Sequence, residues 1–118
     1  MACSNIESVN LPNCTYISAG AFTECSNLKN VYGLQNCSLI GLNTFGDCDN
    51  ITSMSLPNCL EIDLGGFSDC SNLSSIYIPN CKKLNTGVFN NCKSLTKIDL
   101  PACSYMAGQC FQDCINLS

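Results

Sequence analysis

The sequence contains no histidine and no tryptophan, and only 12% of its 118 residues are charged. Histidine is the side chain most used as a general base and as a metal ligand at neutral pH, so its absence argues against most catalytic and metal sites. The formal net charge is -4, and no basic patch is present that could neutralise phosphates, which argues against nucleic-acid binding. No apolar run reaches the roughly 20 residues that cross a bilayer, so no membrane span is predicted.

The polar residues are mostly Asn, Ser and Thr rather than Lys and Glu, which favours an extracellular or cell-surface location. Met1 and Ala2 lead directly into the repeated part of the chain, so no signal peptide is predicted within it. Without histidine there is no Ser/His/Asp or Cys/His constellation, and the acidic residues fall mostly where turns are expected. We therefore predict a protein that is not an enzyme, with no catalytic residue and no cofactor.

A unit of 22 residues is repeated along the whole chain, and each copy begins at a cysteine. The second copy carries one extra residue, best placed at Gly33. Repeats of this length predict a solenoid, in which each copy forms one coil and buries its apolar side chains against its neighbours. We predict one domain over residues 1–118, with coils at residues 3–24, 25–47, 48–69, 70–91 and 92–113 and a partial sixth copy at residues 114–118.

The seventh and ninth positions of the unit are apolar, which is the alternation of a strand with one buried face. A parallel strand is therefore predicted in each copy, at residues 9–11, 31–34, 54–56, 76–78 and 98–100. Proline follows the strand in four copies and ends it, because proline has no N–H to donate to a ladder. Glycine before the twentieth position predicts a turn with positive φ at Gly20, Gly65 and Gly87.

Phenylalanine occupies the twentieth position of every copy and occurs nowhere else in the chain. If equivalent residues of successive coils stack, these rings form one continuous column in the interior. The predicted column is Phe22, Phe45, Phe67, Phe89 and Phe111.

The unit C-x-N-L-x-x-I-x-L-P-x-C-x-x-I-x-x-G-x-F-x-x resembles the BspA-like branch of the leucine-rich repeat proteins over residues 3–118. The second copy departs from it with Gln35 in place of proline, and the fifth with Gly108 one place early. The resemblance implies a leucine-rich-repeat-type right-handed superhelix, with a parallel β-sheet on one side and turns and short helical segments on the other. It also implies surface-associated, non-enzymatic roles in adhesion and partner binding.

The cysteines fall into two columns, apart from Cys110. Both columns are expected to hold small buried thiols, because free cysteine packs as a small hydrophobe. Disulfides between neighbours of one column are the alternative in a secreted chain, although parallel Cβ vectors suit the bond poorly. Zinc is disfavoured, because histidine and C-x-x-C pairs are absent. Cys110 is predicted to be the most exposed or reactive thiol. The columns are Cys3, Cys25, Cys48, Cys70, Cys92 and Cys114, and Cys14, Cys37, Cys59, Cys81 and Cys103.

The eighth position lies on the predicted strand between two buried residues, so its side chain points out of the sheet, as does the sixth. This face is the default binding surface of a solenoid. Tyr32 and Tyr77 are amphipathic side chains of the kind enriched at interfaces, although an exposed Tyr also simply suits a strand. Tyr16 and Tyr105 fall on a different face and receive no role. The candidate binding residues are Asn10, Tyr32, Ser55, Tyr77 and Asp99.

Five Asn-x-Ser/Thr sequons are possible sites of N-glycosylation in a eukaryotic secretory protein. The alternative is that asparagine recurs at these two positions of the unit because it suits turns. The sequon residues are Asn13, Asn36, Asn50, Asn72 and Asn116.

The first and last copies are as apolar as the middle ones, whereas solenoids normally end in polar capping repeats. Two functions are compatible with this pattern. The first is a cell-surface or extracellular module for adhesion that binds a protein or glycan partner on its sheet face. The second is a structural subunit that stacks end to end with copies of itself into an extracellular filament.

Overall fold

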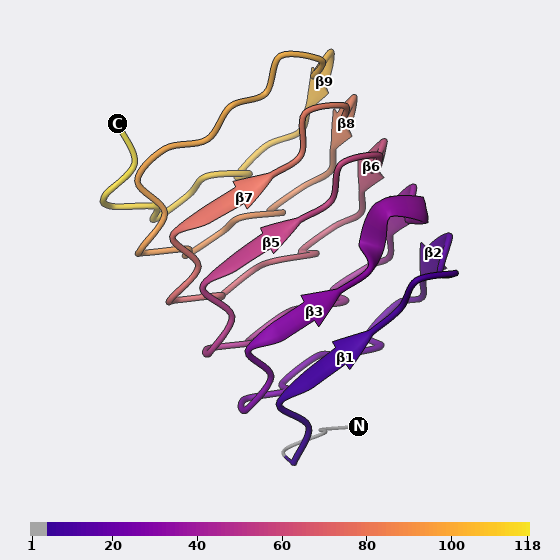
Figure 1. Ribbon diagram of the computed structural model, residues 1–118. Helices are drawn as coiled ribbons and strands as arrows, with labels where there is room; N and C mark the ends of the chain where they lie inside the picture. Colours follow the sequence, from indigo (N-terminus) through magenta and orange to yellow (C-terminus); the bar gives the residue numbers. More distant parts are fainter. Residues whose placement is uncertain (1–4) are drawn as a thin grey trace.

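The computed structural model describes residues 5–118 and shows a stack of coils, one for each repeat (Figure 1). Every strand pairing in this part of the chain is parallel and joins one coil to the next. The stack measures 33 × 28 × 19 Å. The predicted solenoid is therefore confirmed.

Short strands run along one side of the stack, which we call the front face. They pair in two sets, so that equivalent residues such as Val9 and Val31, or Met54 and Ile76, lie side by side. Only the middle residue of each strand is turned toward the core. The front strands are β1 (Ser8–Asn10), β3 (Asn30–Tyr32), β5 (Ser53–Ser55) and β7 (Ser75–Tyr77), with β1 paired to β3 and β5 to β7.

The front sheet is interrupted between β3 and β5, which belong to separate two-stranded sheets. The extra residue of the second copy lies here: Gly33 has a φ of 76° and is followed by a 3-10 helix, η1 (Leu34–Asn36). The insertion and the interruption of the ladder therefore occur at the same coil. The strand predicted at residues 98–100 is also not formed.

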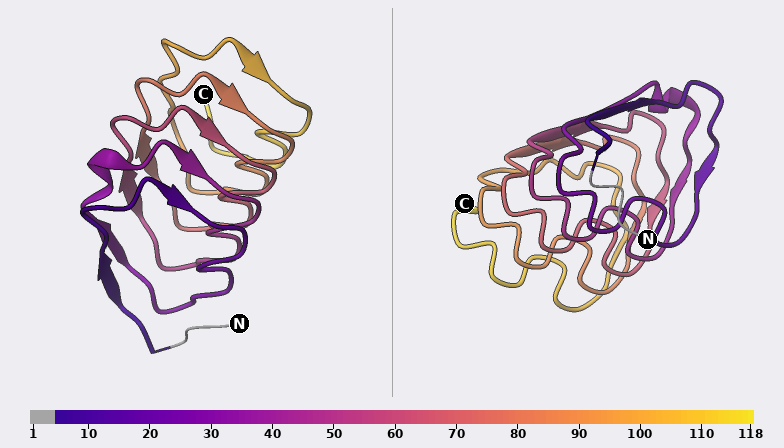
Figure 2. Two further views of the ribbon diagram at one scale, coloured as in Figure 1. Left: turned by 90° about the vertical axis from the view of Figure 1, so that its right-hand side faces the viewer. Right: turned by 90° about the horizontal axis from the view of Figure 1, so that it is seen from below.

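A second parallel sheet lies on another side of the coils and corrects the expectation of a sheet on one side only (Figure 2). Each of its strands is two residues long, and the second residue is buried in every strand except β9, where both residues are exposed. Strands this short carry no alternation that a sequence pattern could reveal. The sheet runs in the order β2 (Tyr16–Ile17), β4 (Leu39–Ile40), β6 (Glu61–Ile62), β8 (Lys83–Leu84) and β9 (Tyr105–Met106).

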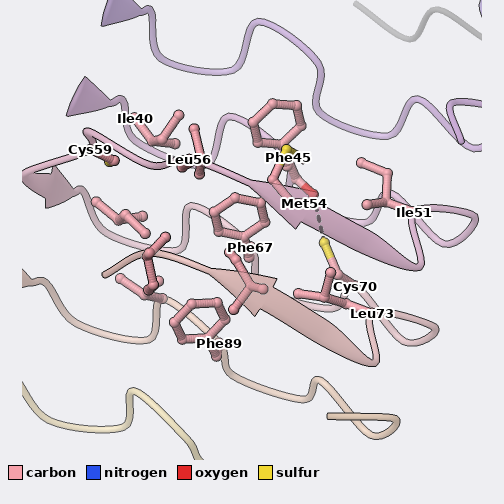
Figure 3. Packing of buried hydrophobic residues seen from close by; sticks show 14 of the residues in the cluster. Ile40, Phe45, Ile51, Met54, Leu56, Cys59, Phe67, Cys70, Leu73 and Phe89 are labelled. Atoms are coloured by element: carbon pink, nitrogen blue, oxygen red, sulfur yellow. Dashed lines mark hydrogen bonds between the residues drawn. The ribbon is translucent and has the colours of Figure 1, made fainter. Parts of the chain in front are cut away.

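The phenylalanine column is confirmed (Figure 3). Successive rings are stacked with centroids 5.2–5.7 Å apart and planes within 15° of parallel. Phe45, Phe67 and Phe89 have no exposed surface, whereas Phe22 and Phe111 are partly buried. Columns of Leu and Ile pack beside the rings and complete the core of every coil.

The segment around each phenylalanine is a series of tight turns rather than the expected helical segment. Backbone bonds span three residues, as from the Cys25 amide to the Phe22 carbonyl at 3.1 Å. The glycine turns are confirmed, with φ of 66–69° at Gly20, Gly65 and Gly87. Left-handed residues also precede each repeat cysteine, at φ of 58–64°, and Asp and Asn are among the few residues that tolerate this conformation. These residues are Glu24, Asp47, Asp69, Asn91 and Asp113.

Phe67→Ala is expected to lower the free energy of unfolding by about 3–5 kcal/mol, because Phe67 is fully buried and stacked on both sides. Phe22→Ala is the matched control and should lose less, because Phe22 is partly exposed. Urea titrations followed by circular dichroism would measure both. Equal losses of unfolding free energy in the two variants would contradict the conclusion that each ring is buried by the coils on both sides of it.

Asp47→Asn is expected to raise the melting temperature slightly at pH 7. Partial burial, together with the negative charges of Asp69, Asp49 and Glu24, raises the pKa of the Asp47 carboxyl above its usual 3.8. Its ionised form therefore destabilises the fold as the pH rises, and the gain from Asn should vanish below about pH 3.8. Asn91 already occupies the same position in another coil and donates to the Asp69 carboxylate at 2.6 Å. Asp99→Asn on the front face is the control for a general change of net charge.

Candidate binding face

A hollow of about 420 Å³ lies on the front face across β3, β5 and β7. Its floor is apolar and consists of the inward residues Val31, Met54 and Ile76. Its rim is polar and uncharged. The rim residues are Asn30, Tyr32, Ser53, Ser55, Ser75 and Tyr77.

Two tyrosines stand on either side of a serine in this hollow. Tyr32 and Tyr77 belong to the second and fourth coils and occupy the position that Ser55 holds in the third. Their side chains are 55% and 59% exposed. Because every coil presents this position outward at the same point of its circuit, the short side chain of Ser55 leaves a gap between two aromatic groups.

Three of the five predicted binding residues, Tyr32, Ser55 and Tyr77, thus meet in one hollow. Asn10 lies one coil before it, on β1, with its Oδ1 beside the Gly33 Cα. Asp99 lies one coil after it and lines an adjoining hollow of about 320 Å³. The sequence-based set omitted Asn30, Ser53 and Ser75. The sequence did contain a signal for these three residues, because all of them occupy the sixth position of the unit, where the side chain also points out of the strand.

The charged groups near this face lie outside the 420 Å³ hollow. Lys97 and Asp99 line the adjoining one. Glu7 and Lys29 form an exposed ion pair at 3.8 Å. The hollow itself therefore offers hydroxyl and amide groups above an apolar floor, with no charge to attract an ionic ligand.

The outward side of the second sheet has different chemistry. The Lys83 ammonium lies 3.8 Å from a Glu61 carboxylate oxygen and 5.5 Å from the centre of the Tyr105 ring. Exposed leucines, Leu60 and Leu64, lie close to β6 in the sequence. Tyr16 and Tyr105 are 49% and 52% exposed here, which makes them close matches in exposure to the front tyrosines.

The cysteine columns are confirmed as mostly buried thiols. In the first column, four thiols donate S–H to the main-chain carbonyl of a phenylalanine 25 or 26 residues earlier, at 3.0–3.1 Å, as Cys70 does to Phe45. These thiols are Cys48, Cys70, Cys92 and Cys114. The second column bonds to the carbonyl two residues further on. Ten of the described cysteines are free, while Cys25 is disulfide-bonded; Cys3 lies outside the described residues. Among residues 5–118, no group of Cys, Asp and Glu could hold a metal ion.

The prediction for Cys110 is wrong. Its side chain is only 3% exposed, and its Sγ lies 3.1 Å from the carbonyl oxygens of Asn85 and Ala107. Thr44 holds the same position in the second coil and is also buried, with its hydroxyl donating to Gly41 at 2.8 Å. Cys110 is therefore a small hydrogen-bonding core residue next to the phenylalanine column.

Four of the five sequon asparagines use the Nδ2 amide to join coils. Asn36, Asn50, Asn72 and Asn116 donate to a main-chain carbonyl of the preceding coil at 2.6–3.0 Å. Asn58 and Asn80, which are not in sequons, make the same bond. The recurrence of asparagine thus has a structural cause, and glycosylation stays a prediction. Asn13, the remaining sequon residue, is exposed.

Within residues 5–118, the structure contains no helix of the length and apolarity that a bilayer crossing needs.

The sequence matches the family described as BspA type leucine rich repeat region, in six copies over residues 1–118. A solved leucine-rich repeat protein of T. pallidum is similar, with a TM-score of 0.90 and 26% identity over 95% of this chain and 56% of that one. A leucine-rich repeat protein from Bacteroides ovatus ATCC 8483 shares the fold, with a TM-score of 0.64 and 15% identity over 94% and 47% of the two chains. No curated protein sequence matches significantly. This chain spans about half the length of each of the two solved leucine-rich repeat proteins.

The buried thiols lead to a pH prediction. Burial raises the pKa of Cys48 to about 11 and that of Cys92 to about 12, from an ordinary value of 9.0. The folded state thus keeps these protons longer than the unfolded state, so their contribution to stability is complete below pH 9 and is lost as the pH rises toward 12. Melting temperatures should fall over this window in the reduced protein. Iodoacetamide at pH 8.5 should label Cys48 and Cys92 only after unfolding; rapid labelling of the folded chain would contradict the burial.

Proposed function

The chain belongs to the family of BspA-type leucine-rich repeat proteins, and from this premise we propose that it is a non-catalytic adhesion module that holds a protein or glycan partner on its front face. Leucine-rich repeats are a protein-interaction type of fold, in which the repeated strands present one continuous surface. Proteins with BspA-type repeats are typically surface-associated, which supports a role at the cell surface or outside the cell.

The observation that carries this proposal is the uncharged hollow of about 420 Å³ between Tyr32 and Tyr77. Tyrosine contributes a large apolar contact at a small entropic cost and retains a hydroxyl for hydrogen bonding, so it is enriched among residues that dominate binding energy. Both side chains are more than half exposed, and neither has a side-chain hydrogen bond within residues 5–118. They are therefore available to a partner.

The surface is also long enough for an extended partner. The hollow shares Tyr32 and Ser55 with a neighbour of about 200 Å³, and it shares Ser75 and Ile76 with the 320 Å³ hollow beside Asp99. The 420 Å³ and 320 Å³ hollows follow one another from the second to the fifth coil, and the 200 Å³ hollow lies beside the first of them, on the second and third coils. This arrangement favours recognition of a chain-like ligand or a protein surface over capture of a small molecule.

The double variant Tyr32→Ala/Tyr77→Ala is expected to bind its partner at least tenfold more weakly, as for interface residues that dominate affinity. The fluorescently labelled chain would be applied to arrays of extracellular-matrix proteins and of glycans, and each ligand bound would be titrated with the variants. Tyr16→Ala/Tyr105→Ala removes two tyrosines of similar exposure from the second sheet and should leave binding unchanged. A ligand that is lost with the second pair and kept with the first would refute the front face as the binding surface.

A further inference from the structure

We propose that the hollow between Tyr32 and Tyr77 binds one ring of a neutral carbohydrate, placed over Ser55 with a tyrosine on each side. This inference rests on the proposed function of the front face and specifies the ligand that the 420 Å³ hollow accepts. Spacing, unpaired polar groups and the lack of charge support it.

The repeat sets the spacing of the two tyrosines. Equivalent rings one coil apart in the core have centroids 5.2–5.7 Å apart. Tyr32 and Tyr77 are two coils apart, and the front sheet is interrupted between β3 and β5, so their positions are separated by at least two coil spacings, which leaves room for one inserted ring. A sugar ring placed there would have a tyrosine on either side. In the core the third coil supplies this middle ring as Phe67; on the front face it supplies only Ser55.

The hydrogen-bonding groups at the rim are not used by the protein. The hydroxyls of Ser53, Ser55 and Ser75 make no hydrogen bond within residues 5–118, and all three residues are exposed. Serines at other positions do bond to the neighbouring coil, such as Ser38 to Thr15 at 3.2 Å and Ser74 to Thr52 at 3.1 Å. The Asn30 amide and the two tyrosine hydroxyls add further donors and acceptors.

These features together match a sugar better than a protein side chain. The C–H groups of a sugar ring carry partial positive charge and suit the negative face of an aromatic ring, while its hydroxyls point outward from the ring edge. An aromatic side chain of a protein partner would fill the same gap but would remove water from the rim hydroxyls without replacing their hydrogen bonds, which is unfavourable. Because the hollow has no charged lining residue, nothing in it would compensate an acidic sugar for lost hydration.

Saturation-transfer NMR on the purified chain tests this directly. The probes are neutral oligosaccharides of glucose, galactose and mannose, compared with sialylated and sulfated oligosaccharides. At least one neutral probe at about 10 mM should receive saturation on its ring C–H protons, and the acidic probes should receive less. Tyr32→Ala and Tyr77→Ala should each weaken binding of that probe by roughly tenfold or more.

Ser55→Tyr provides the sharper test, because it fills the gap with the missing ring while adding to the exposed surface only. It should abolish carbohydrate binding and leave the melting temperature close to that of the parent chain. Tyr16→Ala/Tyr105→Ala should bind the probe as the parent does. If no neutral probe binds, or if binding survives Ser55→Tyr, the carbohydrate inference is overturned. A protein ligand whose binding still depends on Tyr32 and Tyr77 would then leave the proposed function standing without it.

Discussion

The structure depends on the registration of one coil with the next. Each coil is too thin to bury its own apolar side chains, so a residue becomes buried only when the equivalent residue of the neighbouring coil lies against it. The phenylalanine column shows this most directly: the three middle rings are fully buried and the two outer rings only partly. Stacking also buries polar backbone groups between coils. The asparagine amides and cysteine thiols satisfy many of these groups by donating to main-chain carbonyls 23 to 25 residues earlier in the chain.

Because the coils are in register, a change of sequence in one coil also alters the surface that this coil forms together with its neighbours. The extra residue at Gly33 interrupts the front sheet between β3 and β5, and the hollow between the two tyrosines spans this interruption. In the same way, the short side chain of Ser55 leaves a gap only because the coils before and after it carry Tyr32 and Tyr77 at the same position. In a solenoid, positions where one copy departs from the pattern are the natural places for recognition, because the pattern itself serves folding.

The front face and the outward side of the second sheet differ in how many of their polar side chains already have a partner within the protein. On the second sheet, Lys83 contacts both Glu61 and Tyr105, so its charge is partly satisfied within the molecule. On the front face, the hydroxyls of Ser53, Ser55 and Ser75 remain without protein partners. Groups left unpaired on a folded surface can form new hydrogen bonds with a ligand at little expense to stability.

The sequence by itself determined the repeat, the phenylalanine column and the outward position of Tyr32 and Tyr77, because each follows from a spacing that is repeated along the chain. Only the tertiary structure decided the features that arise between coils. The second sheet could not be foreseen, since its two-residue strands exist only through pairing with their neighbours. The burial of Cys110 was mispredicted because its surroundings come from residues some 25 places earlier in the chain. The hollow likewise exists only when three coils lie side by side, because its lining residues come from three different repeats.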